Sequence, residues 1–148
     1  MTYKKLLRPL LLSIISASAL GLASCASGPS YAEVSKTLPP IAKGKGRVFV
    51  YRATSFGAAV RPSVKIDDQV VGKSMGNGFL YTDQTPGSHQ ISIMTEYNHK
   101  NTINVASGNP TFVRCHVTPG LLAAHVLPNE VDDATGEQEI QNCKLAGE

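Results

Sequence analysis

The residues of this chain with the widest scope for chemistry are three cysteines and four histidines. Cys25 comes directly after Leu22, Ala23 and Ser24, and small residues before a cleavage point are what a signal-processing peptidase requires. A thiol on the first residue of a processed chain can carry lipid through a thioether. The spacing therefore predicts cleavage between Ser24 and Cys25, with Cys25 as the lipidation site.

Residues 1–24 have the layout of a secretory signal. Lys4, Lys5 and Arg8 form a basic start, and residues 10–22 form an apolar stretch that is diluted by Ser, Ala and Gly. A membrane-spanning helix needs about 20 predominantly apolar residues. The stretch therefore favours a cleaved signal over an uncleaved helix, and a soluble secreted protein is the other alternative.

The four residues that end at Cys25 resemble the lipobox of bacterial lipoproteins. The resemblance implies a diacylglyceryl thioether on Cys25, cleavage before it and N-acylation afterwards. Each buried CH₂ contributes about 0.8 kcal/mol, and stable anchoring needs at least two chains, which this modification supplies. Residue 26 is Ala rather than Asp, which is similar to an outer-membrane sorting signal. The expected location is the outer membrane, with the protein facing the periplasm or the cell surface.

The net charge of +3 comes entirely from the signal. Removing its three basic residues from the chain's 14 leaves 11, which equals the 11 acidic residues. The processed chain is therefore neutral and shows no basic stripe for nucleic acid. Its length fits one domain with a modest core.

Cys115 and Cys143 are the two remaining cysteines. An even pair outside the cytoplasm predicts a disulfide, which would contribute about 3–4 kcal/mol on the chain-entropy model. The alternative is a pair of free buried thiols.

The spacing of apolar residues changes along the chain. Residues 25–46 contain Pro, Gly and Ser without a helical or strand period, which predicts a flexible tether after the lipidated cysteine; a short helix at 31–36 is a weak alternative. Residues 47–148 alternate with a period of two and are interrupted by Gly and Pro turns. This pattern predicts an all-β domain, a small β-sandwich (Ig/transthyretin-like) of seven or eight short strands.

Individual segments of this domain can be assigned. Residues 67–69 are expected to form a tight turn, residues 97–101 a hairpin tip, and Leu122, Ala124 and Val126 one face of a strand. Thr135 and Gln138 have capping-box spacing, which predicts a short C-terminal helix within 132–144.

Two family resemblances cover this domain. Residues 64–67, 71–72 and 86–91 resemble the PEGA-type β-repeat of bacterial surface proteins, with Asp68 where that family usually has Gly. The domain from Gly46 to Lys144 is similar to small bacterial lipoproteins catalogued as a domain of unknown function, in segments 46–52, 71–74, 78–81, 85–87, 112–114 and 143–144. This resemblance implies a lipoprotein sandwich but no activity and no site residues.

No catalytic constellation or metal set is predicted. His116 and His125 lie on consecutive expected strands and could begin a Zn or Cu site, but no third ligand is spaced to complete it. Two surface histidines are the preferred interpretation. The chain has no Gly-x-Ser-x-Gly elbow. We therefore expect no cofactor and no enzymatic activity.

The function expected from these patterns is a non-enzymatic binding or structural role in the cell envelope, with membrane attachment through Cys25 and an unidentified envelope protein as partner. The alternative is a periplasmic or secreted lipoprotein that binds a ligand or inhibits a hydrolase, for which residues 97–101 are the candidate loop.

Overall fold

The structure is a computed structural model that describes residues 25–147. Within these residues the chain forms nine strands and two short helices. In chain order they are α2 (Tyr31–Val34), β1 (Gly46–Arg52), β2 (Ser63–Ile66), β3 (Gln69–Lys73), β4 (Gly78–Gln84), β5 (Gly87–Met94), β6 (Asn98–Val105), β7 (Pro110–Thr118), β8 (His125–Val131), α3 (Asp133–Ile140) and β9 (Lys144–Leu145).

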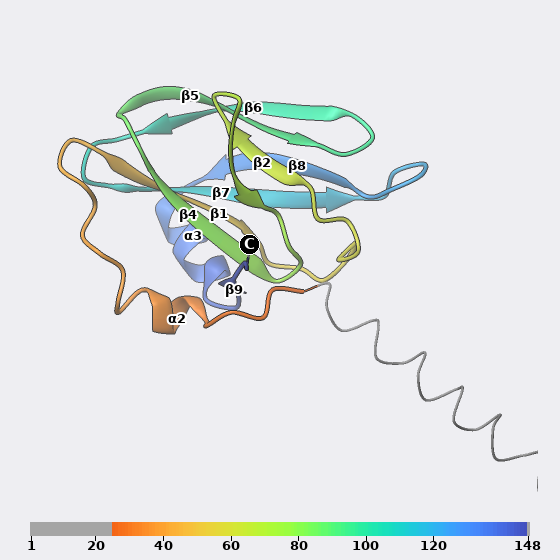
Figure 1. Ribbon diagram of the computed structural model, residues 1–148, viewed down its shortest axis with the longest axis horizontal. Helices are drawn as coiled ribbons and strands as arrows, with labels where there is room; N and C mark the ends of the chain where they lie inside the picture. The colour runs from red at the N-terminus through yellow and green to blue at the C-terminus, as the bar shows by residue number, and fades with distance from the viewer. Residues whose placement is uncertain (1–24, 148) are drawn as a thin grey trace, which may run out of the picture.

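The strands form two stacked sheets, as the predicted sandwich requires. One sheet has the order β8-β7-β1-β4-β9 and the other β3-β2-β5-β6. Pairing is antiparallel except for β1 with β7 and β4 with β9. Figure 1 shows α2 and α3 on the side of the five-stranded sheet that faces away from β2, β5 and β6. The molecule therefore has three layers rather than two.

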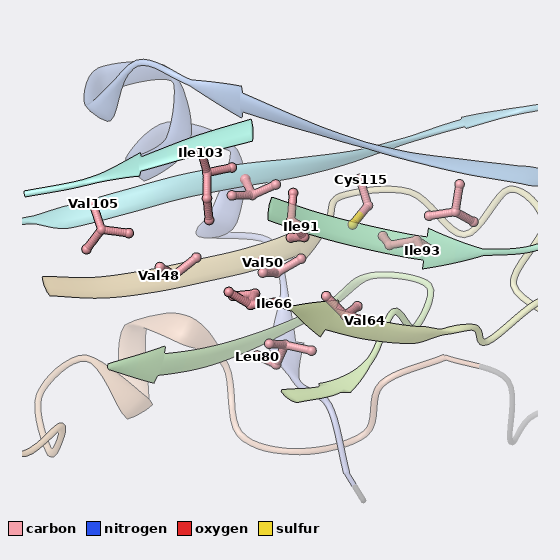
Figure 2. Close-up of a cluster of buried hydrophobic side chains, with 12 residues drawn as sticks. Val48, Val50, Val64, Ile66, Leu80, Ile91, Ile93, Ile103, Val105 and Cys115 are labelled. Carbon is pink, nitrogen blue, oxygen red and sulfur yellow. The ribbon is translucent and has the colours of Figure 1, made fainter. Parts of the chain in front are cut away.

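The inner core lies between the two sheets. Alternate β-branched and aliphatic side chains from both sheets meet there, and Figure 2 shows them packed together with Cys115. The period-two pattern predicts this arrangement, because successive side chains of a strand point to opposite faces. Its buried members are Val48, Val50, Val64, Ile66, Leu80, Ile91, Ile93, Ile103, Val105, Val113, Cys115 and Val126.

A second, aromatic core covers the outer face of the five-stranded sheet. Phe49 and Phe112 stack with ring centroids 5.3 Å apart, and Tyr31 of α2 meets Phe49 edge-on at 5.6 Å. Ile140 and Cys143 complete the cluster from the C-terminal side. Since both faces of the sheet are covered, all seven residues of β1 are buried.

The C-terminal helix forms where it was expected, but with a different cap. Asp132 is the N-cap, and its side chain accepts a hydrogen bond from the Thr135 N–H at 3.0 Å. The predicted capping box at Thr135 and Gln138 therefore lies inside the helix. The helix also comes so close to β7 that a Cβ at Gly136 would stand 2.2 Å from Phe112 Cγ.

Two loop predictions differ from the structure. The β5–β6 turn consists of Thr95, Glu96 and Tyr97, so residues 98–101 belong to β6 and not to a hairpin tip. The strand before Val126 starts only at His125, and Leu122 lies in the β7–β8 loop with 90% of its surface exposed. The tight turn at Asp67 and Asp68 is confirmed, and both residues have positive φ.

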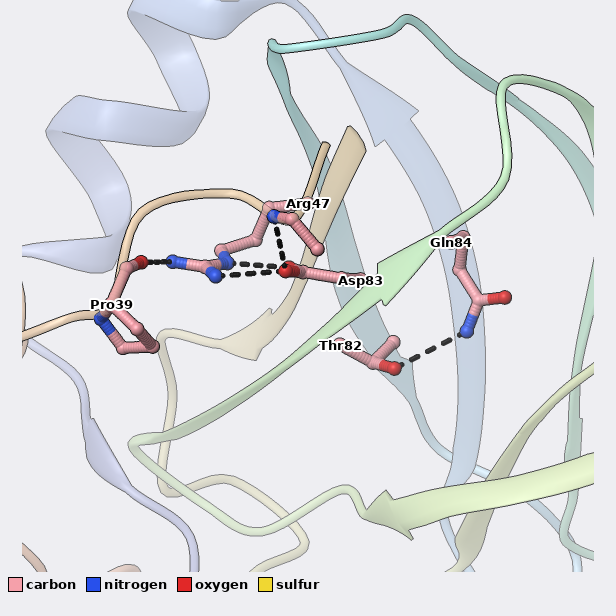
Figure 3. Close-up of polar contacts among 6 residues, drawn as sticks. Pro39, Arg47, Thr82, Asp83 and Gln84 are labelled. Carbon is pink, nitrogen blue, oxygen red and sulfur yellow. Dashed lines mark hydrogen bonds and ion pairs between the residues drawn. The ribbon is translucent and has the colours of Figure 1, made fainter. Parts of the chain in front are cut away.

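Residues 25–46 differ most from the prediction, because they pack along the domain instead of forming a free tether. Val34 is buried in the aromatic core, and the Tyr31 N–H donates to the Cys143 carbonyl at 3.0 Å. Figure 3 shows Arg47 bound to Asp83 through two nitrogens, at 2.6 and 2.9 Å, and to the Pro39 carbonyl at 2.8 Å. Aromatic contacts and this buried guanidinium therefore fix the segment, although its composition resembles a linker.

Candidate functional site

Cys25 lies at the margin of the folded domain. The residue is half-buried and forms a parallel bridge with Gly76 in the turn between β3 and β4. Ala26, the next residue, is buried, and its N–H donates to the Gly76 carbonyl at 3.0 Å. The backbone is therefore tied to the domain from the first residue after Cys25. Ser24, the other half of the predicted cleavage site, lies outside the described residues.

The β3–β4 turn that receives Cys25 is held by the β1–β2 loop. The Asn77 N–H donates to the Thr54 carbonyl at 3.1 Å. At Gly76 an added Cβ would stand 3.0 Å from the Ala58 side chain, so the two segments are in close contact. The surroundings of Cys25 are thus built from two connections that lie far apart in the sequence.

Arg52 fixes the β1–β2 loop from inside the domain. The side chain is fully buried and donates to the Val60 carbonyl at 2.8 Å and to the Phe56 carbonyl at 2.5 Å. Burial lowers the pKa of this guanidinium, because desolvation disfavours its charged form. Its role is structural, since it donates to two loop carbonyls that lie outside the strand pairing of the sheets.

Glu96 fixes the neighbouring β7–β8 loop. Its carboxylate accepts hydrogen bonds from the backbone N–H groups of Leu121, Leu122 and Ala123 and lies 3.3 Å from His125 Nε2. These donors lower the pKa of Glu96 to about 2, the Ala123 N–H having the largest effect. The carboxylate therefore remains charged throughout the physiological range.

The two cysteines of the predicted disulfide are free thiols in the structure. Cys115 belongs to the core between the sheets, whereas Cys143 belongs to the aromatic core on the outer face. The two thiols therefore pack in different cores, on the two sides of the five-stranded sheet. The arrangement favours the free buried pair, which the sequence left as the alternative.

The histidines do not assemble a metal site in the described chain. The β7–β8 register places His116 opposite Leu127 and His125 opposite Thr118, so the two rings are not partners. His125 lies instead beside His99, with ring centroids 5.1 Å apart. Within residues 25–147 no group of three or more His, Cys, Asp or Glu side chains could hold a metal ion.

A pocket of about 430 Å³ opens between β7, α3 and the β1–β2 loop, and Arg114, His116 and Glu139 contribute to its lining. Its charged groups bind one another. Glu139 accepts from the Tyr51 hydroxyl at 2.6 Å and from Arg114 at 2.9 Å. Burial and this carboxylate raise the pKa of Tyr51. The cluster thus anchors α3 to the sheet.

The four-stranded sheet exposes β3 at its edge. Among the described residues β3 pairs only with β2, and Val70 has 62% of its surface exposed. Beside it, Val71, Gly72 and Leu80 border a groove of about 320 Å³. An edge strand with unpaired backbone groups can pair with an extended segment of another chain.

Sequence reasoning missed Arg52 and Glu96. Both are isolated charged residues in runs of other types, and only the distant loops that they contact give them a role. None of the helices in residues 25–147 is long and apolar enough to cross a membrane.

Comparison with known proteins identifies a family whose function is unknown. The sequence model of a family described as "Protein of unknown function (DUF2846)" matches residues 42–126, which is more than half of the chain. An uncharacterized protein of Haemophilus influenzae is 27% identical over 133 residues, which cover 86% of this chain and 79% of the relative. No solved structure matches the chain.

Proposed function

Because the chain belongs to the DUF2846 family of proteins of unknown function, its role has to be argued from its own residues, and we propose that it is an outer-membrane lipoprotein. In this proposal Cys25 carries the lipid, and the sandwich is a non-enzymatic binding module of the cell envelope. The observation that carries the proposal is the lipobox-like sequence that ends at Cys25, a residue whose backbone bridges to Gly76 in the β3–β4 turn.

The position of Cys25 is compatible with modification. The residue is half-buried, whereas Ala26 after it is buried and hydrogen-bonded. A lipid on the Cys25 sulfur would leave the aromatic and inner cores undisturbed, because neither includes this residue. Two or three acyl chains supply the membrane affinity without any contribution from the fold.

A binding role is supported by how the domain uses its polar groups. Arg47, Arg52 and Glu96 hold backbone segments, and the Glu139 carboxylate is occupied by Tyr51 and Arg114. The β3 edge, in contrast, presents backbone donors and acceptors beside an apolar groove. We propose that an extended segment of an envelope protein pairs with β3.

The test is site-specific photo-cross-linking in intact cells that make the full-length protein. A benzophenone amino acid replaces Val70 on the β3 edge, and a matched variant carries it at Gln138, which is exposed on α3. We expect one protein adduct of defined mass from the Val70 position in the outer-membrane fraction, and none from Gln138.

Absence of an adduct at Val70, or equal adducts at both positions, would contradict pairing at β3. Recovery of both variants in the soluble fraction would contradict the membrane assignment itself. Tandem mass spectrometry of the Val70 adduct would identify the partner.

A further inference from the structure

We propose that the end of the sandwich next to Cys25 lies against the bilayer, with the tip of the β7–β8 loop inserted among the lipid headgroups. The inference rests on the proposed lipidation of Cys25 and adds an orientation to it. The occupant of this surface is the lipid of the membrane in which the acyl chains are anchored.

The topology brings four connections to this end. β1 is antiparallel to β4 and parallel to β7, and β3 and β5 are both antiparallel to β2. The β1–β2, β3–β4, β5–β6 and β7–β8 connections therefore lie together, and Cys25 bridges to the second of them. Figure 1 shows the loops and the start of the described chain on the same side of the molecule.

Exposed apolar side chains gather at this end. Six large apolar residues are exposed in the described chain, and five of them lie in or next to these four connections. Leu121 and Leu122 are the most exposed, at 92% and 90%. Phe56, Met94 and Tyr97 are the other three exposed residues at this end. The sixth residue, Val70, lies near the opposite end of the domain. Exposed apolar patches of this kind mark membrane or protein contacts.

The β7–β8 loop is built to present its leucines. The Glu96 carboxylate binds the backbone N–H groups of residues 121–123, so these donors already have partners. A loop whose N–H groups are satisfied can enter a region of low water content at a smaller cost than one whose groups are unpaired. The β1–β2 loop also packs against the β7–β8 loop, since a Cβ at Gly57 would stand 2.8 Å from the Ala124 side chain.

The short link between Cys25 and this end of the domain favours lipid over another occupant. Ala26 is hydrogen-bonded to Gly76, so no free spacer separates the acylated residue from this end of the domain. Arg61 and Lys73 are exposed there, and basic side chains are attracted to anionic headgroups. At the opposite end, the β2–β3 turn exposes Asp67 and Asp68. Lys43 and Lys45 precede β1 at this same opposite end, so the charge there is mixed, and the orientation rests on the anchor and the exposed apolar residues.

The experiment uses the absence of tryptophan from the chain. Full-length Leu122→Trp and Val70→Trp variants each contain a single tryptophan, at exposed positions near opposite ends of the domain. Each protein is purified from membranes, its N-terminal peptide is analysed by mass spectrometry, and it is reconstituted into phosphatidylethanolamine–phosphatidylglycerol vesicles with or without brominated acyl chains.

We expect a blue-shifted emission for Leu122→Trp that brominated lipid quenches, and a water-like, unquenched emission for Val70→Trp. If acylated Leu122→Trp is not quenched, or Val70→Trp is quenched equally, the orientation is wrong while the lipoprotein assignment stands. A blue shift without quenching means that protein covers the loop, which also overturns the proposal. A Cys25 without lipid in the membrane-derived protein refutes the proposed function, and the orientation with it.

Discussion

At the scale of single residues, the buried charges of this protein serve the backbone. Arg47 connects β1 to the N-terminal segment through the Pro39 carbonyl, and Arg52 connects β1 to the loop that follows it. Removing either side chain would take the donor from these part-buried hydrogen bonds, and a hydrogen bond to a charged group contributes about 1.5–3 kcal/mol. Arg47 therefore fixes the segment before β1, and Arg52 fixes the loop that supports the β3–β4 turn beside Cys25.

The cysteine pair gives a prediction at this scale. Burial raises the pKa of Cys115 to about 11 and that of Cys143 to about 12, so both thiols should be unreactive in the folded protein. We expect iodoacetamide to leave both unmodified under native conditions and to alkylate both in urea without reductant. Mass spectrometry of the two peptides provides the measurement. Alkylation only after reduction would show a disulfide and contradict the structure.

The sequence predicts the role of a residue only where that role depends on residues next to it in the chain. The lipobox resemblance at Cys25 rests on four contiguous residues and stays a prediction, and the confirmed turn at Asp67 and Asp68 is equally local. Arg52 and Glu96 could not be identified, because their partners depend on how distant loops pack. The disulfide stays a prediction that the structure does not show, because the sequence does not reveal on which face of a sheet each cysteine lies.

At the scale of elements, the β7–β8 loop depends on the Glu96 carboxylate. The folded-state pKa of about 2 lies below the ordinary 4.5, so the charged form contributes stability above pH 4.5, and this is lost as pH falls through 2. We expect Glu96→Gln to lower the urea midpoint at neutral pH, and its difference from the wild type to shrink in acid. A difference that is independent of pH would show that the carboxylate is not the group responsible.

The contact between α3 and β7 gives a second prediction for an element. Replacing a helical glycine by alanine normally stabilises a helix by about 1 kcal/mol. At Gly136 the sign should reverse, because the new Cβ would stand 2.2 Å from Phe112 Cγ. Overpacking of this kind costs about 1–3 kcal/mol. We expect Gly136→Ala to lower the urea midpoint and exposed Gln138→Ala to leave it nearly unchanged. A stabilised Gly136→Ala would refute close packing of α3.

Elements were predicted well where periodicity determines them. The alternation in β2, β5 and β7 marks their inner faces, and the sandwich follows from it, whereas β1 is a continuous β-branched and aromatic run that is buried on both faces. The pattern failed at Leu122, where apolar residues alternate in a loop, because alternation alone does not distinguish a core face from an exposed surface. It also failed for residues 25–46, where a few anchoring contacts by Tyr31, Val34 and Arg47 fix a segment with the composition of a linker.

At the scale of the whole molecule, anchor and orientation are linked. A long flexible tether would let the domain turn freely above the membrane. Here the chain is bound to the domain from Ala26 onward, so an acylated Cys25 would hold one end of the sandwich at the bilayer and direct the turn at Asp67 and Asp68 away from it. The β3 edge would then extend outward from the membrane surface toward a partner.

The central claim is that Cys25 is the lipidated first residue of the mature protein. Mass spectrometry of the N-terminal peptide, from protein purified out of native membranes, tests it most directly, with Cys25→Ser as the control. We predict a peptide that begins at Cys25 and carries a diacylglyceryl group with or without an amide-linked acyl chain, and we predict that the control loses this modification. A mature peptide without lipid, or one that begins at another residue, would contradict the account.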